Sequence, residues 1–124
     1  MKFILLCILL FACSFSGNAI HFFNGTYEEA LQLAKKEKKN LFISFTASWC
    51  GPCRMLGPVI EQLDNQYPDV VVGKVNVDDE QELAMRYGVM SIPTVIFFKD
   101  GKEIDRKVGV MPPEAFVQVL EANK

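Results

Sequence analysis

Two patterns of apolar residues alternate along this chain. One is a short continuous run of apolar residues, and the other is a longer stretch in which an apolar residue recurs every three to four positions. Residues 41–47 form a continuous apolar run typical of a buried strand, and apolar residues then recur at helical spacing from Met55 to Leu63. Lys99-Asp100-Gly101-Lys102 is a two-residue hairpin signal. The predicted strands span residues 20–23, 41–47, 70–77, 94–98 and 103–108, and the predicted helices start at Thr26, Cys50, Asp78 and Pro112.

The order of these elements, βαβαβαββα, predicts an α/β protein. Strands joined through helices usually pair in parallel, whereas a two-residue hairpin makes its strands antiparallel. We therefore expect one central mixed β-sheet flanked by helices on both faces, with the strands at 41–47 and 70–77 in central positions.

The first 19 residues differ from the rest and follow the pattern of an export signal. Lys2 precedes an apolar run from Phe3 to Cys13, and small residues end the segment at positions minus three and minus one of a cleavage site. We expect residues 1–19 to be a cleaved signal peptide and residues 20–124 to form one domain. An uncleaved membrane anchor is the alternative, although the apolar run is short for a bilayer span.

A second processing route is lipidation of Cys13. Leu10-Phe11-Ala12-Cys13 resembles the box after which bacterial lipoproteins are cut and acylated on cysteine, although Phe11 fits that box poorly. The expected location is the bacterial periplasm, with secretion or anchoring through Cys13 as the alternatives. Contact with a membrane is expected only for the lipidated form.

Charge and cysteine content exclude several classes of function. The chain carries 13 basic and 15 acidic residues, so it has no basic surplus to attract nucleic acid. Two of its four cysteines, Cys7 and Cys13, leave with the signal, so no structural disulfide framework is expected. The single histidine, His21, cannot supply a second ligand cluster for zinc or iron-sulfur, and no metal or other cofactor is predicted.

The remaining thiols lie in Trp49-Cys50-Gly51-Pro52-Cys53, between the predicted strand and the next helix. At a helix N-terminus, unpaired N–H groups and the helix dipole favour a thiolate, which makes Cys50 the expected nucleophile. Cys53 is expected one turn further in, beneath Cys50 and more shielded, close enough to form a disulfide with it. The pair is therefore a predicted two-electron carrier, with an inert or purely structural disulfide as the alternative.

The chain resembles the thioredoxin family along nearly all of residues 20–124. The landmarks that carry the resemblance are the Trp49-Cys50-Gly51-Pro52-Cys53 motif, Pro58, Lys74-Val75-Asn76-Val77-Asp78, Ile92-Pro93-Thr94, Asp100-Gly101 and Gly109. The resemblance implies a thioredoxin fold and thiol-disulfide oxidoreductase activity. It also implies a cis peptide bond before Pro93, close to the disulfide.

The resemblance further implies a shallow apolar groove in which many different client proteins bind, mainly through backbone and apolar contacts. Its predicted lining is Trp49, Gly51, Pro52, Ile92, Pro93, Gly109 and Val110.

One position departs from the family pattern. Thioredoxins place a buried aspartate six residues before the first cysteine, where it is thought to assist proton removal from the second cysteine; here that residue is Ser44. A serine hydroxyl can order a water molecule but cannot act as an ionised base. We expect Cys53 to lose its proton through water held by Ser44, more slowly than beside an aspartate. Lys74, the matching family lysine, is then a cation without its usual partner, either buried or reaching solvent or another acid.

The Gly51-Pro52 spacer favours the reducing direction, because Gly-Pro resembles the reductants of this superfamily and oxidants usually carry dipeptides such as Pro-His. We therefore predict an exported reductase of client disulfides. Outside the cytoplasm it needs electrons from a membrane-embedded thiol donor. Disulfide oxidation or isomerisation is one alternative, and a binding module with idle cysteines is another. The sequence contains no long heptad repeat that would predict an oligomer, so a monomer is expected.

Overall fold

The computed structural model describes residues 26–124. In chain order its elements are α2 (Tyr27–Glu37), β1 (Asn40–Thr46), α3 (Gly51–Gln66), β2 (Val70–Asn76), α4 (Gln81–Arg86), β3 (Thr94–Lys99), β4 (Lys102–Val108) and α5 (Pro113–Ala122). This order confirms the predicted alternation from the first helix onward. The predicted strand at 20–23 and the predicted signal segment lie outside the described residues.

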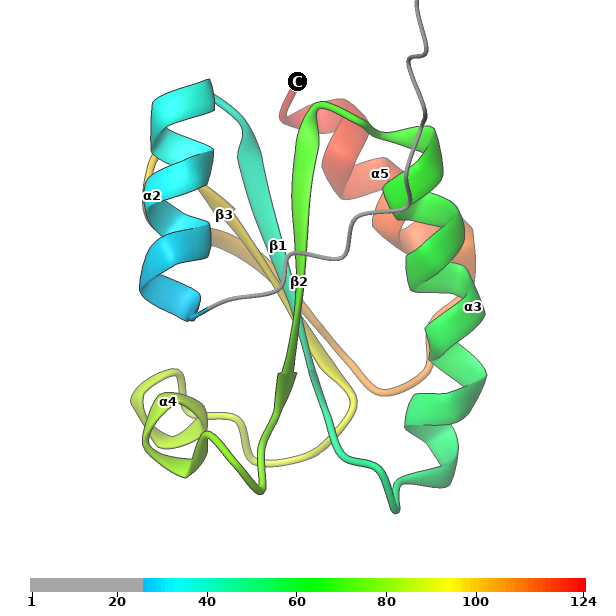
Figure 1. Cartoon of the computed structure of the whole chain (residues 1–124). Helices are drawn as coiled ribbons and strands as arrows, with labels where there is room; N and C mark the ends of the chain where they lie inside the picture. Colours follow the sequence, from blue (N-terminus) through cyan, green and yellow to red (C-terminus); the bar gives the residue numbers. More distant parts are fainter. Residues whose placement is uncertain (1–25) are drawn as a thin grey trace, which may run out of the picture.

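The four described strands form one mixed sheet in the order β2-β1-β3-β4. β1 pairs in parallel with β2 and antiparallel with β3, and β3 pairs antiparallel with β4. Figure 1 shows α2 and α4 on one side of this sheet and α3 and α5 on the other. The predicted mixed sheet with two covered faces is confirmed. β2, predicted as a central strand, lies at the edge of the described sheet.

Alternating side chains of β1 build a core on each face of the sheet. Leu41, Ile43 and Phe45 belong to the cluster that includes residues of α2 and α4, and Phe42 belongs to the cluster that includes residues of α3 and α5. Because successive side chains of a strand point to opposite faces, Ser44 lies on the α3 side. No helix within residues 26–124 is long and apolar enough to cross a membrane.

Two turns show how local sequence sets the element boundaries. Asp100 and Gly101 both have positive φ, 53° and 77°, as a type I′ hairpin turn requires, so β3 turns directly into β4. After β2, the Asn76 side chain accepts a hydrogen bond from the Asp78 backbone N–H at 2.9 Å. This turn delays α4, which was predicted from Asp78 and begins only at Gln81.

Candidate active site

Cys50 is the N-cap residue of α3. Its backbone is extended (φ −82°, ψ 110°), and its sulfur accepts a hydrogen bond from the Cys53 backbone N–H at 3.2 Å. Pro52 stands in the first turn of the helix, where the N–H that it lacks has no partner to lose. The predicted placement of Cys50 at a helix start is confirmed, so a thiolate at this sulfur would face the positive end of the helix.

Cys50 and Cys53 are joined by a disulfide, with their Cα atoms 5.3 Å apart. Their burial differs from the prediction, because Cys50 is 4 % exposed and Cys53 is 8 % exposed, so the second cysteine is not the more shielded one. Both cysteines belong to a small cluster with Ala47 and Ile92, and Cys53 in addition lines a cavity. Cys53 therefore borders a cavity that Cys50 does not line.

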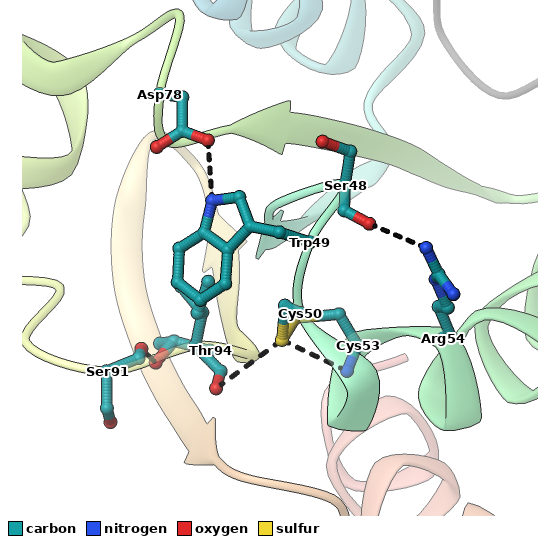
Figure 2. Close-up of a disulfide and its surroundings, with 9 residues drawn as sticks. Ser48, Trp49, Cys50, Cys53, Arg54, Asp78, Ser91 and Thr94 are labelled. Atoms are coloured by element: carbon teal, nitrogen blue, oxygen red, sulfur yellow. Dashed lines mark hydrogen bonds between the residues drawn. A yellow bond between two sulfur atoms is a disulfide. The ribbon is translucent and has the colours of Figure 1, made fainter.

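The Trp49 side chain is held across the loop by Asp78, to which the sequence analysis assigned no role at the site. Its indole N–H donates to Asp78 Oδ2 at 2.8 Å, although 68 % of the residue is exposed. Figure 2 shows this nitrogen directed at the Asp78 carboxylate, with the cysteines beside the base of the indole. A large apolar surface is thus fixed next to the disulfide without being buried.

The loop before β3 forms the other wall of the site. The Ile92-Pro93 peptide bond is cis, as predicted, and the Ile92 carbonyl oxygen lies 4.0 Å from Cys50 Sγ. The Gly109 N–H donates to the Pro93 carbonyl at 2.8 Å, which brings the segment after β4 to the same place. Gly109 has φ 86°, a conformation that glycine adopts without steric cost.

The structure brings most of the predicted groove residues together around Cys50. Trp49 and Val110 remain exposed, Ile92 packs against the cysteines and precedes the cis Pro93, and Gly51 and Pro52 form the exposed start of α3. Met90, in the same loop as Ile92, is also apolar and is 94 % exposed, although sequence reasoning did not include it. Its position two residues before Ile92 was the available signal.

A cavity of about 740 Å³ opens beside Cys53, and Ile92 is not among its lining residues. A smaller pocket of about 20 Å³ adjoins the same cysteine and includes Ser44. Lys74 lines both, and it pairs with Ser44 in the parallel register of β1 and β2. The larger cavity is lined by Thr46, Ala47, Ser48, Cys53, Arg54, Gly57, Pro58, Glu61, Lys74 and Asn76.

These two predicted residues differ in exposure. Ser44 is buried, at 6 %, whereas Lys74 is exposed, so the lysine reaches solvent and is not a buried cation. Ser44, Lys74 and Cys53 line the same small pocket. Residues 26–124 hold no group of three or more His, Cys, Asp or Glu side chains placed to bind a metal ion.

A cysteine pair at a helix start, next to a cis-proline loop at the end of a mixed sheet, defines a thiol-disulfide oxidoreductase of the thioredoxin fold. Residues 19–122 match the family described as Thioredoxin, and the chain belongs to this family. It is therefore a thioredoxin-type disulfide oxidoreductase, and thioredoxins act on disulfide-containing substrates.

Individual relatives agree with this assignment. The chain is 50 % identical over 83 residues to a thioredoxin of Chlamydia caviae, which covers 67 % of this chain and 81 % of that protein. It is 47 % identical over 80 residues to a thioredoxin of Bacillus subtilis, or 64 % of this chain and 77 % of that protein. Among solved structures, a mutant thioredoxin from Halobacterium salinarum matches with a TM-score of 0.70 and 35 % identity, over 82 % of this chain and 88 % of that one.

Proposed function

We propose that this protein is an exported reductase of client disulfides, in which Cys50 attacks and Cys53 resolves. The observation that carries the proposal is the geometry at Cys50: its sulfur caps α3, accepts the Cys53 N–H at 3.2 Å and lies next to the Ile92 carbonyl. A thiolate formed there is stabilised by the helix end, and a client sulfur approaching it meets the exposed indole of Trp49.

The reaction transfers two electrons in two exchange steps. The Cys50 thiolate attacks one client sulfur, a mixed disulfide forms, and the other client sulfur leaves as a thiolate. Cys53 then loses its proton and attacks the Cys50 sulfur, which breaks the mixed disulfide and releases the second client thiolate. The products are the reduced client and the Cys50–Cys53 disulfide, which is the state of the structure.

Client binding rests on apolar surface and backbone around Cys50. Trp49, Met90 and Val110 are 68 %, 94 % and 45 % exposed, and they come from the loops before α3, before β3 and after β4. Exposed apolar groups without a matching polar pattern favour contact with many client sequences over one. We assign client binding to these residues together with Gly51, Pro52, Ile92, Pro93 and Gly109.

The proposed location and electron supply follow from the first 19 residues, whose pattern is that of an export signal. An exported reductase has no soluble NADPH-linked partner, so a membrane-embedded thiol donor reduces the Cys50–Cys53 disulfide after each cycle. The protein works as a monomer in the periplasm. Fractionation of the bacterium that produces it, followed by mass determination of the processed N-terminus, tests cleavage after Ala19 against acylation of Cys13.

Replacing the resolving cysteine tests the chemistry directly. The Cys53→Ser variant should accumulate mixed disulfides with insulin or other disulfide-bearing clients, visible as adducts on non-reducing gels that disappear on reduction. Cys50→Ser is the matched control and should form none at neutral pH. Adducts on Cys50→Ser but not on Cys53→Ser would reverse the assigned roles, and adducts on neither would favour a binding module with idle cysteines.

A further inference from the structure

The proton that leaves Cys53 needs an acceptor, and β1 supplies none that is ionised. Ser44 occupies the position of the family aspartate, and its hydroxyl is not a base near neutral pH. The charged groups that line the cavities at Cys53 are Arg54 and Glu61 from α3 and Lys74 from β2. Glu61 is the one carboxylate among these lining residues. We propose that Glu61 accepts the Cys53 proton through a water molecule in the pocket that the two residues share.

Helix geometry places Glu61 on the same side of α3 as Cys53. Cys53, Gly57 and Glu61 are spaced four residues apart, so their side chains follow one stripe of the helix. Long helical side chains lean back toward the preceding turn, which directs the Glu61 carboxylate toward Gly57 and the cysteine beyond it. The Cα atoms of Cys53 and Glu61 are about 12 Å apart along the axis at ~1.5 Å per residue, too far for direct contact.

Gly57 keeps the space between them open. A Cβ built on Gly57 meets no heavy atom within 4 Å, so no neighbouring side chain fills the gap. The pocket of about 20 Å³ reaches across this gap and is lined by Ser44, Cys53, Gly57 and Glu61, among others. A cavity of roughly 10–15 Å³ or more holds one water molecule when polar groups surround it. The Ser44 hydroxyl and the Glu61 carboxylate are such groups, so the pocket fits a bridging water.

The surroundings of Glu61 give the proton a path onward to solvent. Glu61 is exposed, and Lys74 from β2 lines the same pocket, where its positive charge favours the thiolate form of Cys53. In the resolving step the Cys53 proton passes through water to Glu61 while the Cys53 sulfur bonds to Cys50. The bond between Cys50 and the client breaks, and the client sulfur leaves with the electron pair.

This inference rests on the proposed function, and the resolving step can be observed separately from the attack. The reduced, processed protein is mixed with dithionitrobenzoate in a stopped-flow instrument, where Cys50 releases one coloured thiolate and Cys53 releases the second. The two phases are followed from pH 5.5 to pH 9.5. The variants are Glu61→Gln and, as the matched control one turn further along α3, Asp64→Asn, which does not line either cavity at Cys53.

We expect Glu61→Gln to leave the first phase unchanged and to slow the second phase about fivefold or more below pH 7. This effect is smaller than the ~10²–10⁴ of a directly bonded general base, because a water intervenes and Glu61 is exposed. The difference should vanish above pH ~9, where a thiol ionises unaided. Asp64→Asn should match the wild type. Adding Ser44→Asp to Glu61→Gln should restore the second phase, because it returns a carboxylate to the wall of the same pocket.

Equal second-phase profiles for wild type and Glu61→Gln would overturn the role of Glu61 while leaving the reductase intact. A slowing that is the same at every pH would also overturn it, because that pattern indicates a structural disturbance. Failure of the wild-type protein to release the second thiolate at all would instead count against the proposed function.

Discussion

Gly73 in β2 is the position where the structure makes its sharpest packing prediction. Gly73 lies opposite Ile43 in the parallel register, and a Cβ added to it would stand 2.5 Å from Ile43 Cδ1. The next nearest atom, Ile43 Cγ1, is 3.9 Å away, so a single methyl group occupies the space. Ile43 is only 1 % exposed and cannot swing into solvent. Gly73→Ala therefore forces one buried side chain out of its place.

The magnitude follows from two opposing effects. Overpacking of a buried site costs about 1–3 kcal/mol. Replacing a glycine inside a strand raises the free energy of unfolding by about 0.5–1 kcal/mol, because the unfolded chain loses conformational freedom. The net loss in the free energy of unfolding should be about 0–2.5 kcal/mol, centred near 1 kcal/mol. It is measured by urea unfolding of the oxidised protein, followed by far-ultraviolet circular dichroism.

A double-mutant cycle tests whether the Ile43 methyl is the cause. Ile43→Val deletes Cδ1 and alone should cost about 0.5–1.5 kcal/mol. In that background Gly73→Ala meets no obstacle and should be neutral or slightly stabilising, a coupling of about 1 kcal/mol or more. Gly57→Ala is the matched control, because its added Cβ meets nothing within 4 Å, and it should stabilise the protein. An equal cost for Gly73→Ala in both backgrounds would refute the reasoning.

Three further predictions concern single side chains. Asp78→Ala removes the acceptor of the Trp49 indole N–H, so the emission of this sole tryptophan should shift and its anisotropy should fall; unchanged spectra would count against the bond. Lys38 has φ 54°, a left-handed conformation that strains any residue with a Cβ, so Lys38→Gly should raise the free energy of unfolding by about 1 kcal/mol. Thermal denaturation measures this, and an unchanged stability would contradict the strain at Lys38. Burial and a hydrogen bond to Tyr87 raise the pKa of Tyr27, so the native state holds that proton while the unfolded chain loses it near pH ~10. Stability should therefore fall as pH rises above ~10, less steeply in Tyr27→Phe, and identical slopes in urea unfolding would be inconsistent with this.

Much of this fold could be predicted because local signals and long-range pairing agree. Several element boundaries are set by interactions among a few neighbouring residues. Examples are the capping box at Thr26, which starts α2, and the left-handed pair Asp100 and Gly101, which joins β3 to β4. The start of α4 could not be read in the same way. It depends on the Asn76 side chain accepting the Asp78 N–H, a turn that competes with helix formation.

The site was predictable at the cysteines and less so around them. The helix start at Cys50 follows from the strand, the Gly-Pro spacer and the apolar period that comes after. The relative exposure of Cys50 and Cys53 depends instead on Ile92, which arrives from a distant loop, and on the space left by Gly57. The spacing of the two cysteines predicts neither the packing of Ile92 nor the open space at Gly57.

The exposure of Lys74 also could not be determined from the sequence. The loss of its family carboxylate partner left Lys74 either buried or reaching solvent or another acid. β2 lies at the edge of the described sheet, where a long side chain reaches water, and Lys74 is exposed. The same register that exposes Lys74 places it beside Ser44 and the cavity at Cys53.

The reduction potential of the Cys50–Cys53 pair tests the central claim most directly. The protein is equilibrated without its first 19 residues in dithiol buffers of graded potential, and the oxidised and reduced forms are quantified after thiol trapping. The account predicts a value near the ~−270 mV of thioredoxin, which suits a donor of electrons to client disulfides. A value near the ~−120 mV of the strongest oxidants in this superfamily would contradict it and make disulfide formation the function.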